Sequence, residues 1–399
     1  MERLNKLLQQ HFTRTCDIAV ICFNLRLKRL SAEIIERQTR MGLGPDITER
    51  LARARADLRM GVPIVVSGEN HALVFAAETL DAVRLADLRG LGGKPVLAVT
   101  SWRAQTLKAR AYDGDLARIA LPSDATLKWV LAIADPADDL RAPMKGPLRS
   151  VRDGDASLSR AAIALTKAAR LLPAVVVLPL ADVGFADLHD LTVVPADAAL
   201  DTGLSPLNPI ISATLPLEVS EAGRLHIFRP DDGAEEHYAI EIGRPRRDVP
   251  VLSRLHSACF TGDLLGSLKC DCGPQLRGAL AQMGHEEAGV LLYLNQEGRG
   301  IGLANKMRAY SLQDQGFDTV EANHRLGFED DERDFRIGAE ILKRMGFGAV
   351  RLLTNNPAKI ARMESCGIEV VERVPLKVGE NTHNHKYLAT KAAKSGHLL

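Results

Sequence analysis

The chain has 399 residues, of which 46% are hydrophobic and 25% are charged, a composition typical of soluble globular proteins. Its 51 Lys and Arg residues balance its 50 Asp and Glu residues, and a net charge of +1 with this many apolar residues excludes a largely disordered chain. The balance also excludes a global basic field that would attract nucleic acid or an anionic membrane, while a local basic site stays open. The longest uncharged apolar stretch, residues 171–181, is shorter than the ~20 residues of a membrane-spanning helix. Six cysteines are too few for a disulfide scaffold and the N-terminus makes a poor secretory signal, so we expect a cytoplasmic protein.

The first half of the chain predicts alternating helices and strands after an N-terminal extension. Residues 1–45 carry mixed charge and end in glycines and a proline, which indicates an extension. Helical spacing over residues 47–59 and 158–172 precedes apolar strand-like runs, which cover residues 64–66, 73–77 and 174–180. Such alternation favours an α/β fold.

The second half has the same character after a break in the pattern. Residues 201–216 are rich in Pro and Gly, so they predict a linker and a domain boundary near residue 208. A β-rich stretch is expected over residues 213–254. The expected strands that follow are residues 290–294 and 350–353, and the expected helices are residues 303–315, 337–345 and 357–365. We therefore expect an α/β protein of two domains, residues 46–207 and 208–399, each with a mixed sheet flanked by helices.

Three cysteines with the spacing Cys-x10-Cys-x-Cys, Cys259, Cys270 and Cys272, are candidate metal ligands. Small buried cysteines are common, and that interpretation suits the other three, which are Cys16, Cys22 and Cys366. The polar neighbours Lys269 and Asp271 argue against this buried-cysteine interpretation for Cys259, Cys270 and Cys272. Three thiolates without an obvious fourth ligand suit a zinc ion that keeps one position open for water, whose pKa zinc lowers toward ~7.

Two loops between a predicted strand and a predicted helix are candidate ligand sites. Residues 296–302, with the sequence Gln-Glu-Gly-Arg-Gly-Ile-Gly, combine glycines, Arg299 and a helix N-terminus, which suit a phosphate group. An ordinary tight turn explains that glycine pattern equally well. Residues 354–357, with the sequence Thr-Asn-Asn-Pro, suit a plain helix cap, but Lys359 lies one turn further and ligands collect at the carboxyl ends of strands.

The acidic run of residues 330–334 precedes a predicted helix. A solvated helix start is the simpler interpretation of these residues alone, with Arg333 as an ion-pair partner.

Taken together, these motifs resemble the GTP cyclohydrolase II family over residues 213–399. The matching runs, in the family's order and spacing, are residues 254–259, 261–263, 266–273, 296–302, 308–310, 312–316, 318–323 and 352–357. The resemblance implies the first step of riboflavin biosynthesis. In that step GTP is hydrolysed to 2,5-diamino-6-(5-phosphoribosylamino)pyrimidin-4(3H)-one, formate and pyrophosphate.

The resemblance also implies roles for individual residues. Cys259, Cys270 and Cys272 would bind one zinc ion per chain, whose water attacks the guanine carbon that leaves as formate. Tyr310 would lie beside the reacting base, Asp331 would act as acid–base carboxylate, and Arg333 would be the nucleophile toward the α-phosphorus. Mg²⁺ would accompany the triphosphate. The positions that would line the GTP pocket are Arg254, His256, Ser257, Gln275, Glu297, Gly298, Arg299, Thr319, Thr354 and Lys359.

Three points qualify this picture. The pKa of arginine exceeds ~12, so its side chain stays protonated and is a poor nucleophile. A purely electrostatic role for Arg333 is therefore the conservative alternative. The family usually has Glu at Ala258 and often Arg at Asn295, so a different nucleotide substrate or an altered product stays an alternative. A nucleotide-binding protein without activity is a third possibility, which the intact cysteines, Tyr310 and Arg333 disfavour.

The N-terminal half resembles 3,4-dihydroxy-2-butanone-4-phosphate synthase more faintly, over residues 58–78 and 158–180. Its loop at residues 67–71 offers one carboxylate, Glu69, and no histidine stands at the second motif near Ser157, whereas Mg²⁺ needs several oxygen ligands. We therefore expect a degenerate domain that supports its neighbour. We further expect GTP as ligand, a homodimer, and neither nucleic acid nor membrane as partner.

Overall fold

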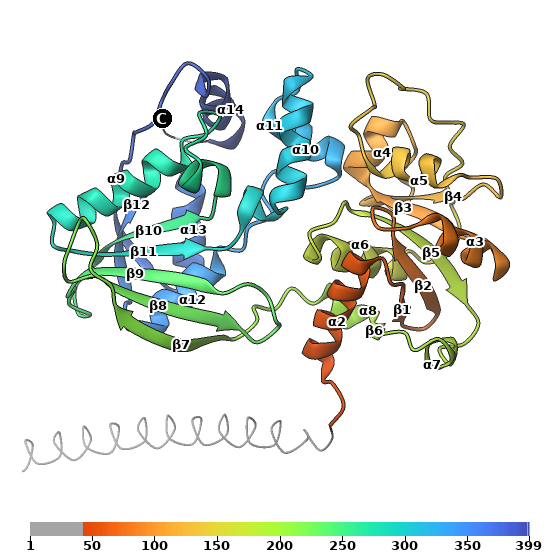
Figure 1. Cartoon of the computed structure of the whole chain (residues 1–399), viewed down its shortest axis with the longest axis horizontal. Helices are drawn as coiled ribbons and strands as arrows, with labels where there is room; N and C mark the ends of the chain where they lie inside the picture. Colours follow the sequence, from red (N-terminus) through yellow and green to blue (C-terminus); the bar gives the residue numbers. More distant parts are fainter. Residues whose placement is uncertain (1–42, 397, 399) are drawn as a thin grey trace, which may run out of the picture. The chain divides into compact units, whose positions relative to one another are not determined.

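The computed structural model describes residues 43–396 and residue 398, so the predicted extension, with Cys16 and Cys22, lies almost wholly outside the described residues. Within the described part, the strands form one sheet of six and one of seven (Figure 1). Each sheet combines parallel with antiparallel pairs and has helices against it. The predicted α/β fold with two mixed sheets is confirmed. We refer to residues 47–206 as the N-terminal half and residues 207–398 as the C-terminal half.

The six-stranded sheet has the order β4-β3-β5-β2-β1-β6. Its strands are β1 (Ile64–Ser67), β2 (His71–Ala76), β3 (Val96–Thr100), β4 (Leu116–Ala120), β5 (Ala174–Leu180) and β6 (Val193–Pro195). Successive residues of a strand point to opposite faces, so Leu73 and Val74 enter different hydrophobic clusters. One face is covered by α3 (Ala82–Gly90), α4 (Ser101–Leu107) and α5 (Leu127–Ala134), and the other by α2 (Ile47–Met60), α6 (Ser157–Ala168) and α8 (Ala196–Leu200). A short helix, α7 (Phe185–Leu188), precedes β6.

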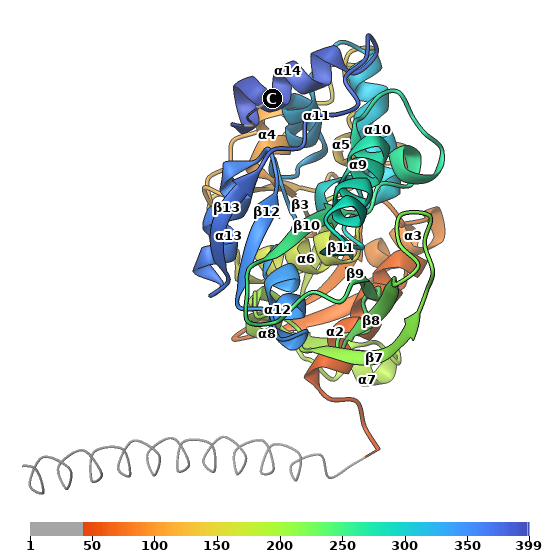
Figure 2. The same cartoon turned by 90° about the vertical axis from the view of Figure 1, so that its left-hand side faces the viewer.

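The seven-stranded sheet has the order β13-β12-β10-β11-β9-β8-β7. Its strands are β7 (Leu207–Thr214), β8 (Arg224–Pro230), β9 (His237–Gly243), β10 (Val251–Ser257), β11 (Ala288–Leu294), β12 (Ala349–Leu353) and β13 (Glu369–Val374). Leu291 packs with α9 (Cys272–His285) on one face, while its neighbours Val290 and Leu292 pack with α12 (Arg336–Arg344) and α13 (Pro357–Ser365) on the other (Figure 2). Strands β11, β10, β12 and β13 run parallel, so their carboxyl ends share one edge.

Two helices of the C-terminal half, α10 (Leu303–Asp314) and α11 (Thr319–Leu326), pack against the N-terminal half rather than against the seven-stranded sheet. Leu312, Leu326 and Phe328 are almost fully buried in the same hydrophobic cluster as Val130 and Ile133 of α5. Residues 47–399 accordingly form a single compact unit. The remaining elements are η1 (Phe260–Leu264), η2 (Glu297–Gly300) and α14 (His385–Ser395).

Most predicted elements are confirmed within a few residues, and two differences have physical reasons. The helix expected over residues 158–172 ends at Ala168, because Arg170 adopts a left-handed backbone with a φ of 60°. The linker expected over residues 201–216 is wrong in its second part, since residues 207–214 form β7. Pro209 is tolerated there because β7 is an edge strand with a bulge beside that residue.

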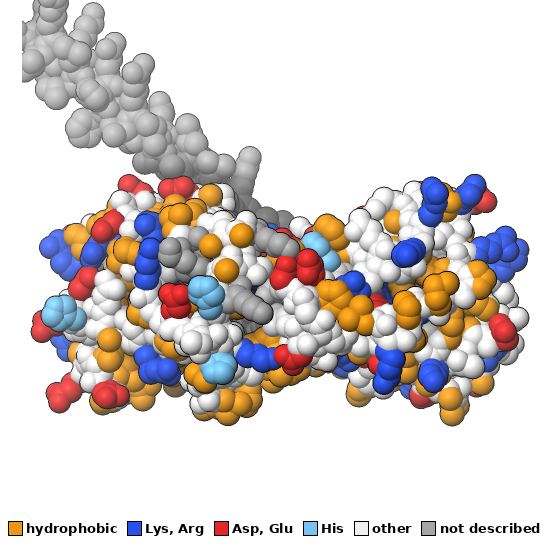
Figure 3. Space-filling model, turned by 90° about the horizontal axis from the view of Figure 1, so that it is seen from above, with side chains coloured by type: hydrophobic (Ala, Val, Ile, Leu, Met, Phe, Trp, Pro, Cys, Tyr) orange, Lys and Arg blue, Asp and Glu red, His pale blue; other side chains and the backbone are white. Residues whose placement is uncertain are grey.

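The surface carries charges of both signs. Figure 3 shows Lys and Arg side chains interspersed with Asp and Glu side chains on the face it presents, in agreement with the net charge of +1. Among the described residues, every helix is too short or too polar to cross a membrane.

Candidate active site

A cavity of about 1100 Å³, its open mouth included, lies where the parallel strands β10, β11 and β12 end. This edge is where ligands bind in open α/β sheets. All the predicted site residues except Asp331 line it, and Asp331 contacts Arg333 at its wall. The lining predicted from sequence is Arg254, His256, Ser257, Cys259, Cys270, Cys272, Gln275, Glu297, Gly298, Arg299, Tyr310, Thr319, Arg333, Thr354 and Lys359.

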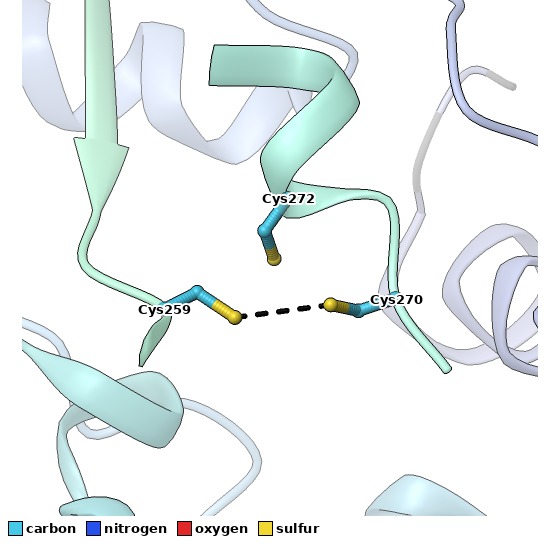
Figure 4. A group of neighbouring side chains, drawn as sticks. All are labelled: Cys259, Cys270 and Cys272. Atoms are coloured by element: carbon cyan, nitrogen blue, oxygen red, sulfur yellow. Dashed lines mark hydrogen bonds between the residues drawn. The ribbon is translucent and has the colours of Figure 1, made fainter. Parts of the chain in front are cut away.

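The three predicted metal ligands converge on one point (Figure 4). Cys259 follows β10, while Cys270 and Cys272 lie at the start of α9. Their sulfur atoms lie within 4.8 Å of one another, and the Sγ atoms of Cys259 and Cys270 are 3.8 Å apart. Zn–S bonds of about 2.3 Å at tetrahedral angles place sulfur atoms about 3.8 Å apart, so the donor set fits zinc. In the described part of the chain, this is the one cluster of three or more His, Cys, Asp or Glu side chains close enough to share an ion.

A glycine leaves the room that this cluster needs. A Cβ atom at Gly262 would lie 2.7 Å from Sγ of Cys270 and 3.1 Å from Sγ of Cys259. The backbone N–H of Gly262 instead donates to Sγ of Cys259 at 3.3 Å. The local sequence therefore both spaces the cysteines and stabilises charge on one sulfur.

The cluster carries negative charge, and a buried lysine compensates it. Hydrogen bonds from the Cys270 and Cys272 thiols, together with Lys306, hold the pKa of Cys259 well below its ordinary value against the effect of burial. The pKa values of Cys270 and Cys272 are raised, chiefly by the hydrogen bonds that these thiols make to Cys259. Nζ of Lys306 lies 3.0 Å from Sγ of Cys259 and 2.9 Å from Oε1 of Glu297.

Sequence reasoning missed Lys306, although a signal was present. Lys306 lies four residues before Tyr310 on a predicted helix, so the two side chains share a face. Burial opposes the charge of Lys306, but its contacts with Cys259 outweigh that effect and raise its pKa. Its Nζ lies 5.7 Å from the centre of the Tyr310 ring, and burial raises the pKa of that phenol, which stays protonated.

A second missed residue, Asp263, organises the end of β10. It accepts hydrogen bonds from Nε2 of His256 at 3.0 Å, from the Tyr293 hydroxyl at 3.0 Å and from the backbone N–H of Cys259 at 3.0 Å. Burial lowers the pKa of His256, so the ring is neutral, and the bond to Asp263 places its proton on Nε2. Nδ1 of His256 is thus an acceptor in a cavity-lining side chain.

Two buried atoms of the cavity lining have no protein partner among the described residues: Nδ1 of His256 and Nε of Arg254. Arg254 otherwise donates to Oε1 of Gln275 at 2.5 Å and to the carbonyl of Leu353 at 3.2 Å. Its pKa is lowered to about 10 by burial, so it remains charged at neutral pH. Buried polar atoms are nearly always hydrogen-bonded, so this pair of an acceptor and a donor suits a polar ligand.

Arg333 and Asp331 form a bidentate pair at the cavity wall. Both nitrogen–oxygen distances are 2.7 Å, and Nη1 of Arg333 also donates to the Ser257 hydroxyl at 3.3 Å. Burial opposes both charges, but the pairing outweighs it, so the pKa of Asp331 is lowered and that of Arg333 is raised. A protonated guanidinium favours the electrostatic alternative for Arg333 over a nucleophile.

The glycine-rich loop only partly faces the cavity. Gly298 and Arg299 line it, and both adopt left-handed backbones with φ near 64° and 63°. A Cβ at Gly300 would lie 2.8 Å from the carbonyl oxygen of Glu332, so that glycine serves close contact with protein. Gly302, the N-cap of α10, approaches the side chain of Arg170, and the phosphate role of this helix N-terminus stays a prediction.

The loop at residues 354–357 caps a helix and lines the cavity at the same time. Oδ1 of Asn356 accepts from the backbone N–H of Ala358 at 2.9 Å, and Pro357 opens α13. This confirms the simpler interpretation of the motif. Thr354 and Asn356 nevertheless line the cavity, together with Lys359, whose Nζ donates to the carbonyl of Leu255 at 3.0 Å.

The two departures from the family pattern differ in position. Ala258 lines the cavity, so a glutamate there would face the ligand. Asn295 is not among the lining residues, and its side chain donates to the carbonyl of Glu236 at 2.5 Å. Tyr387, on α14, also lines the cavity, and no feature of the sequence that we used pointed to it.

Comparison with known proteins identifies the class of enzyme. The family model described as GTP cyclohydrolase II matches residues 208–375. A GTP cyclohydrolase-2 of Azospirillum brasilense is 45% identical over 359 residues, which cover 87% of this chain and 93% of the relative. A GTP cyclohydrolase-2 of Actinobacillus succinogenes is 55% identical over 196 residues, 49% of this chain and 90% of the relative. The chain belongs to the GTP cyclohydrolase II family and is a hydrolase of that type.

A likeness to one solved structure is weaker. The structure of RibBX, a two-domain 3,4-dihydroxy-2-butanone 4-phosphate synthase from A. baumannii, overlaps 82% of this chain and 100% of its own. The sequence identity is 18% and the TM-score is 0.28, too low to support a conclusion. The Azospirillum relative, in contrast, extends well into the N-terminal half, so that half also occurs in another protein named for the cyclohydrolase.

Proposed function

We propose that this enzyme converts GTP to formate, pyrophosphate and the phosphoribosylated diaminopyrimidine named above, with one zinc ion per chain and Mg²⁺ on the triphosphate. The observation that carries this proposal is that a three-cysteine cluster and the Arg333–Asp331 pair adjoin one cavity. GTP presents a purine and a triphosphate, so its site needs a Lewis acid and anion-binding groups. The family membership supports GTP as the substrate.

Cys259, Cys270 and Cys272 would hold the zinc ion, and the geometry of the donors supports this assignment. Zinc bound there supplies a Lewis acid that lowers the pKa of a bound water toward ~7. Lys306 offsets part of the negative charge of three thiolates and hydrogen-bonds one of them, which holds Cys259 in place. Glu297 fixes Lys306 in turn and accepts from the backbone N–H of Phe260 at 2.5 Å.

The base of GTP would contact the groups that surround this cluster. His256 offers an acceptor at Nδ1 and Arg254 a donor at Nε, and both lie on β10, directly before Cys259. Tyr310 stays protonated and can donate a hydrogen bond or a proton near the reacting ring. These groups would orient the guanine toward the metal site.

The triphosphate would be bound by cationic side chains of the cavity lining. The lining includes Arg299, Arg333 and Lys359, and the one carboxylate that the described residues contribute to it is Glu297. Mg²⁺ would therefore take most of its oxygen ligands from the phosphates themselves. In this proposal Arg333 stabilises the charge that develops on the reacting phosphate. Asp331 holds Arg333 in position through its two hydrogen bonds.

The test is an assay of zinc-loaded protein with GTP and Mg²⁺ in which formate, pyrophosphate and the pyrimidine are each quantified. Release of all three in equal amounts supports the proposal. Release of pyrophosphate without formate would contradict the hydrolytic ring opening.

A second candidate, another nucleotide substrate or an altered product, has one observation in its favour. Ala258 leaves unfilled a part of the cavity where the family pattern has a glutamate. A comparison of GTP with other purine and pyrimidine nucleotides under the same conditions separates the candidates, since faster turnover of a different nucleotide would favour the second.

We also propose a domain division near residue 208, because the first sheet ends at Pro195 and the second begins at Leu207. The assembly that we propose is a cytoplasmic homodimer, which light scattering of the purified protein and cell fractionation test.

A further inference from the structure

The residues that connect α11 to α12 carry both Asp331 and Arg333. We call residues 327–334 the 327–334 segment. Asp331 and Arg333 must keep a fixed position relative to the cavity, but they lie in a stretch without regular secondary structure. What fixes this segment is therefore part of the function of the site. Several of its contacts lead to the N-terminal half.

The first set of contacts comes from the end of β3 and the first turn of α4. The hydroxyl of Thr100 donates to the carbonyl of Gly327 at 2.8 Å, and Nε1 of Trp102 donates to Oε2 of Glu329 at 2.9 Å. The Trp102 ring also stacks on His324, with ring centres 3.6 Å apart and an angle of 6° between the planes. Nε2 of His324 in turn lies 2.7 Å from Oδ1 of Asp330. These contacts hold the residues that precede Asp331.

The second contact comes from the last turn of α6. Nζ of Lys167 lies 2.6 Å from Oε1 of Glu332, which stands between Asp331 and Arg333 in the chain. The same oxygen accepts from the backbone N–H of Glu329 at 3.0 Å, and the backbone N–H of Glu332 donates to the carbonyl of Arg299 at 3.0 Å. Lys167 therefore holds the segment at Glu332, and the backbone of Glu332 ties the segment to the glycine-rich loop.

An ordinary interface ion pair is the alternative explanation. The chain offers one for comparison: Arg55 on α2 pairs with Asp232 at 3.0 Å, and these side chains are 18% and 24% exposed. The Lys167 and Glu332 side chains are both 23% exposed, so the two pairs are matched in burial. Partly exposed pairs contribute little to the free energy of unfolding. What distinguishes the Lys167 pair is that its partner, Glu332, stands between Asp331 and Arg333 in the chain.

We propose that the N-terminal half positions Asp331 and Arg333, the groups that act on the reacting phosphate. Lys167 and Trp102 are the positioning residues, and they hold the 327–334 segment at Glu332 and Glu329. This inference rests on the proposed function of Asp331 and Arg333. It assigns a role to a half that lacks recognisable chemistry of its own. Loss of a positioning contact that lets a reacting group move by about 1 Å can cost ~100-fold in rate.

The test compares Lys167→Met and Trp102→Phe with the matched control Arg55→Met. We expect kcat for pyrophosphate release to fall roughly 10- to 100-fold in the first two variants with KM nearly unchanged, because the misplaced groups act on the transition state. Lys167→Arg should keep most of the wild-type activity that Lys167→Met loses, since arginine also carries a positive charge. Arg55→Met should behave as wild type.

Amide hydrogen exchange gives a readout that does not depend on the substrate. Exchange in residues 327–334 should be faster in Lys167→Met and Trp102→Phe than in wild type, and unchanged in Arg55→Met. If both kcat and exchange in Lys167→Met and Trp102→Phe equal those of Arg55→Met, the inference is wrong. If wild type releases neither formate nor pyrophosphate from GTP, the proposed function fails instead, and the exchange result still decides whether the N-terminal half orders the segment.

Discussion

At the scale of single residues, the three cysteine thiols are the most specific feature of the site. With two of them replaced, too few soft ligands remain for an open tetrahedral zinc site. The double variant Cys270→Ser/Cys272→Ser should therefore lose stoichiometric zinc and formate release while it keeps its fold. Metal analysis of the purified protein and far-ultraviolet circular dichroism measure the two effects.

Cys366 provides the matched control for that experiment. It is half-buried against the core below α12 and α13 and takes no part in the cluster. Cys366→Ser should retain zinc and activity. Full zinc occupancy in the double variant would contradict the assignment of the ligands.

The second prediction at this scale concerns Arg333, which we assign to the phosphate, and Tyr310, which we assign to the base. Arg333 is held by Asp331 and Ser257, whereas Tyr310 lies close to Lys306 and the cysteine cluster. Arg333→Ala should block pyrophosphate release, while Tyr310→Phe should disturb events at the base and let a partly processed product escape. Chromatographic analysis of the products distinguishes the two. Identical product profiles that differ only in rate would leave no reason to assign separate roles.

At the scale of helices and strands, the sequence predicts what depends on local pattern. Strands such as β5 and β11 are continuous apolar runs, and helices such as α13 end where a glycine follows. The pattern fails where the sheet edge decides, as at Pro209 in β7. Asp263 could not be predicted because its importance comes from side chains that reach it from other elements, whereas the spacing of Lys306 from Tyr310 was a usable signal. The cavity was predictable because its motifs follow parallel strands that end at one edge.

A histidine at the start of β9 predicts a pH dependence of stability. His237 is 4% exposed, and its Nδ1 accepts from the backbone N–H of Asn295 at 3.0 Å. Burial lowers the pKa of His237 from 6.5 to about 4. Below pH 6.5 the unfolded chain takes up a proton that the folded chain refuses until about pH 4. The free energy of unfolding should therefore fall by up to about 3 kcal/mol as the pH is lowered from 6.5 to about 4.

Denaturant unfolding of wild type and His237→Gln across that pH range tests this assignment. Glutamine supplies an acceptor and does not titrate, so the variant should lack the loss. Carboxylates such as Asp139 and Asp331, whose pKa values are lowered below 3.8 by their cationic partners despite burial, lose their contribution only at lower pH. Parallel pH profiles for the two proteins would show that His237 is not the source.

At the scale of the whole molecule, the N-terminal half keeps a hydrophobic core, but its described residues offer no evident site for the synthase reaction that its sequence brings to mind. Its Ser67–His71 turn joins β1 and β2, and Glu69 there is exposed. Mg²⁺ binds weakly to one carboxylate. We expect no 3,4-dihydroxy-2-butanone 4-phosphate from ribulose 5-phosphate with the full-length protein and Mg²⁺. Detection of that product by mass spectrometry would show that the half is an active synthase.

The core shared by the two halves predicts the outcome of removing the first one. Leu312, Leu326 and Phe328 of the C-terminal half are at most 1% exposed, in a cluster that also contains Val130 and Ile133. Burial of each such large side chain contributes about 1.5–3 kcal/mol, so their exposure removes much of a typical stability of about 5–15 kcal/mol. A truncated protein that begins at residue 208 should therefore aggregate or unfold at a lower temperature than the full chain.

The activity of the truncated protein shows whether the N-terminal half only covers apolar surface of the C-terminal half or also positions the 327–334 segment. Arg308 would lose its partners Glu78 and Asp135, at 2.9 Å and 3.2 Å, and the 327–334 segment would lose Lys167 and Trp102. The soluble fraction should thus turn over GTP more slowly, by about the factor that we expect for Lys167→Met. A truncated protein as soluble and as active as the full chain would show that the N-terminal half neither covers nor positions its neighbour.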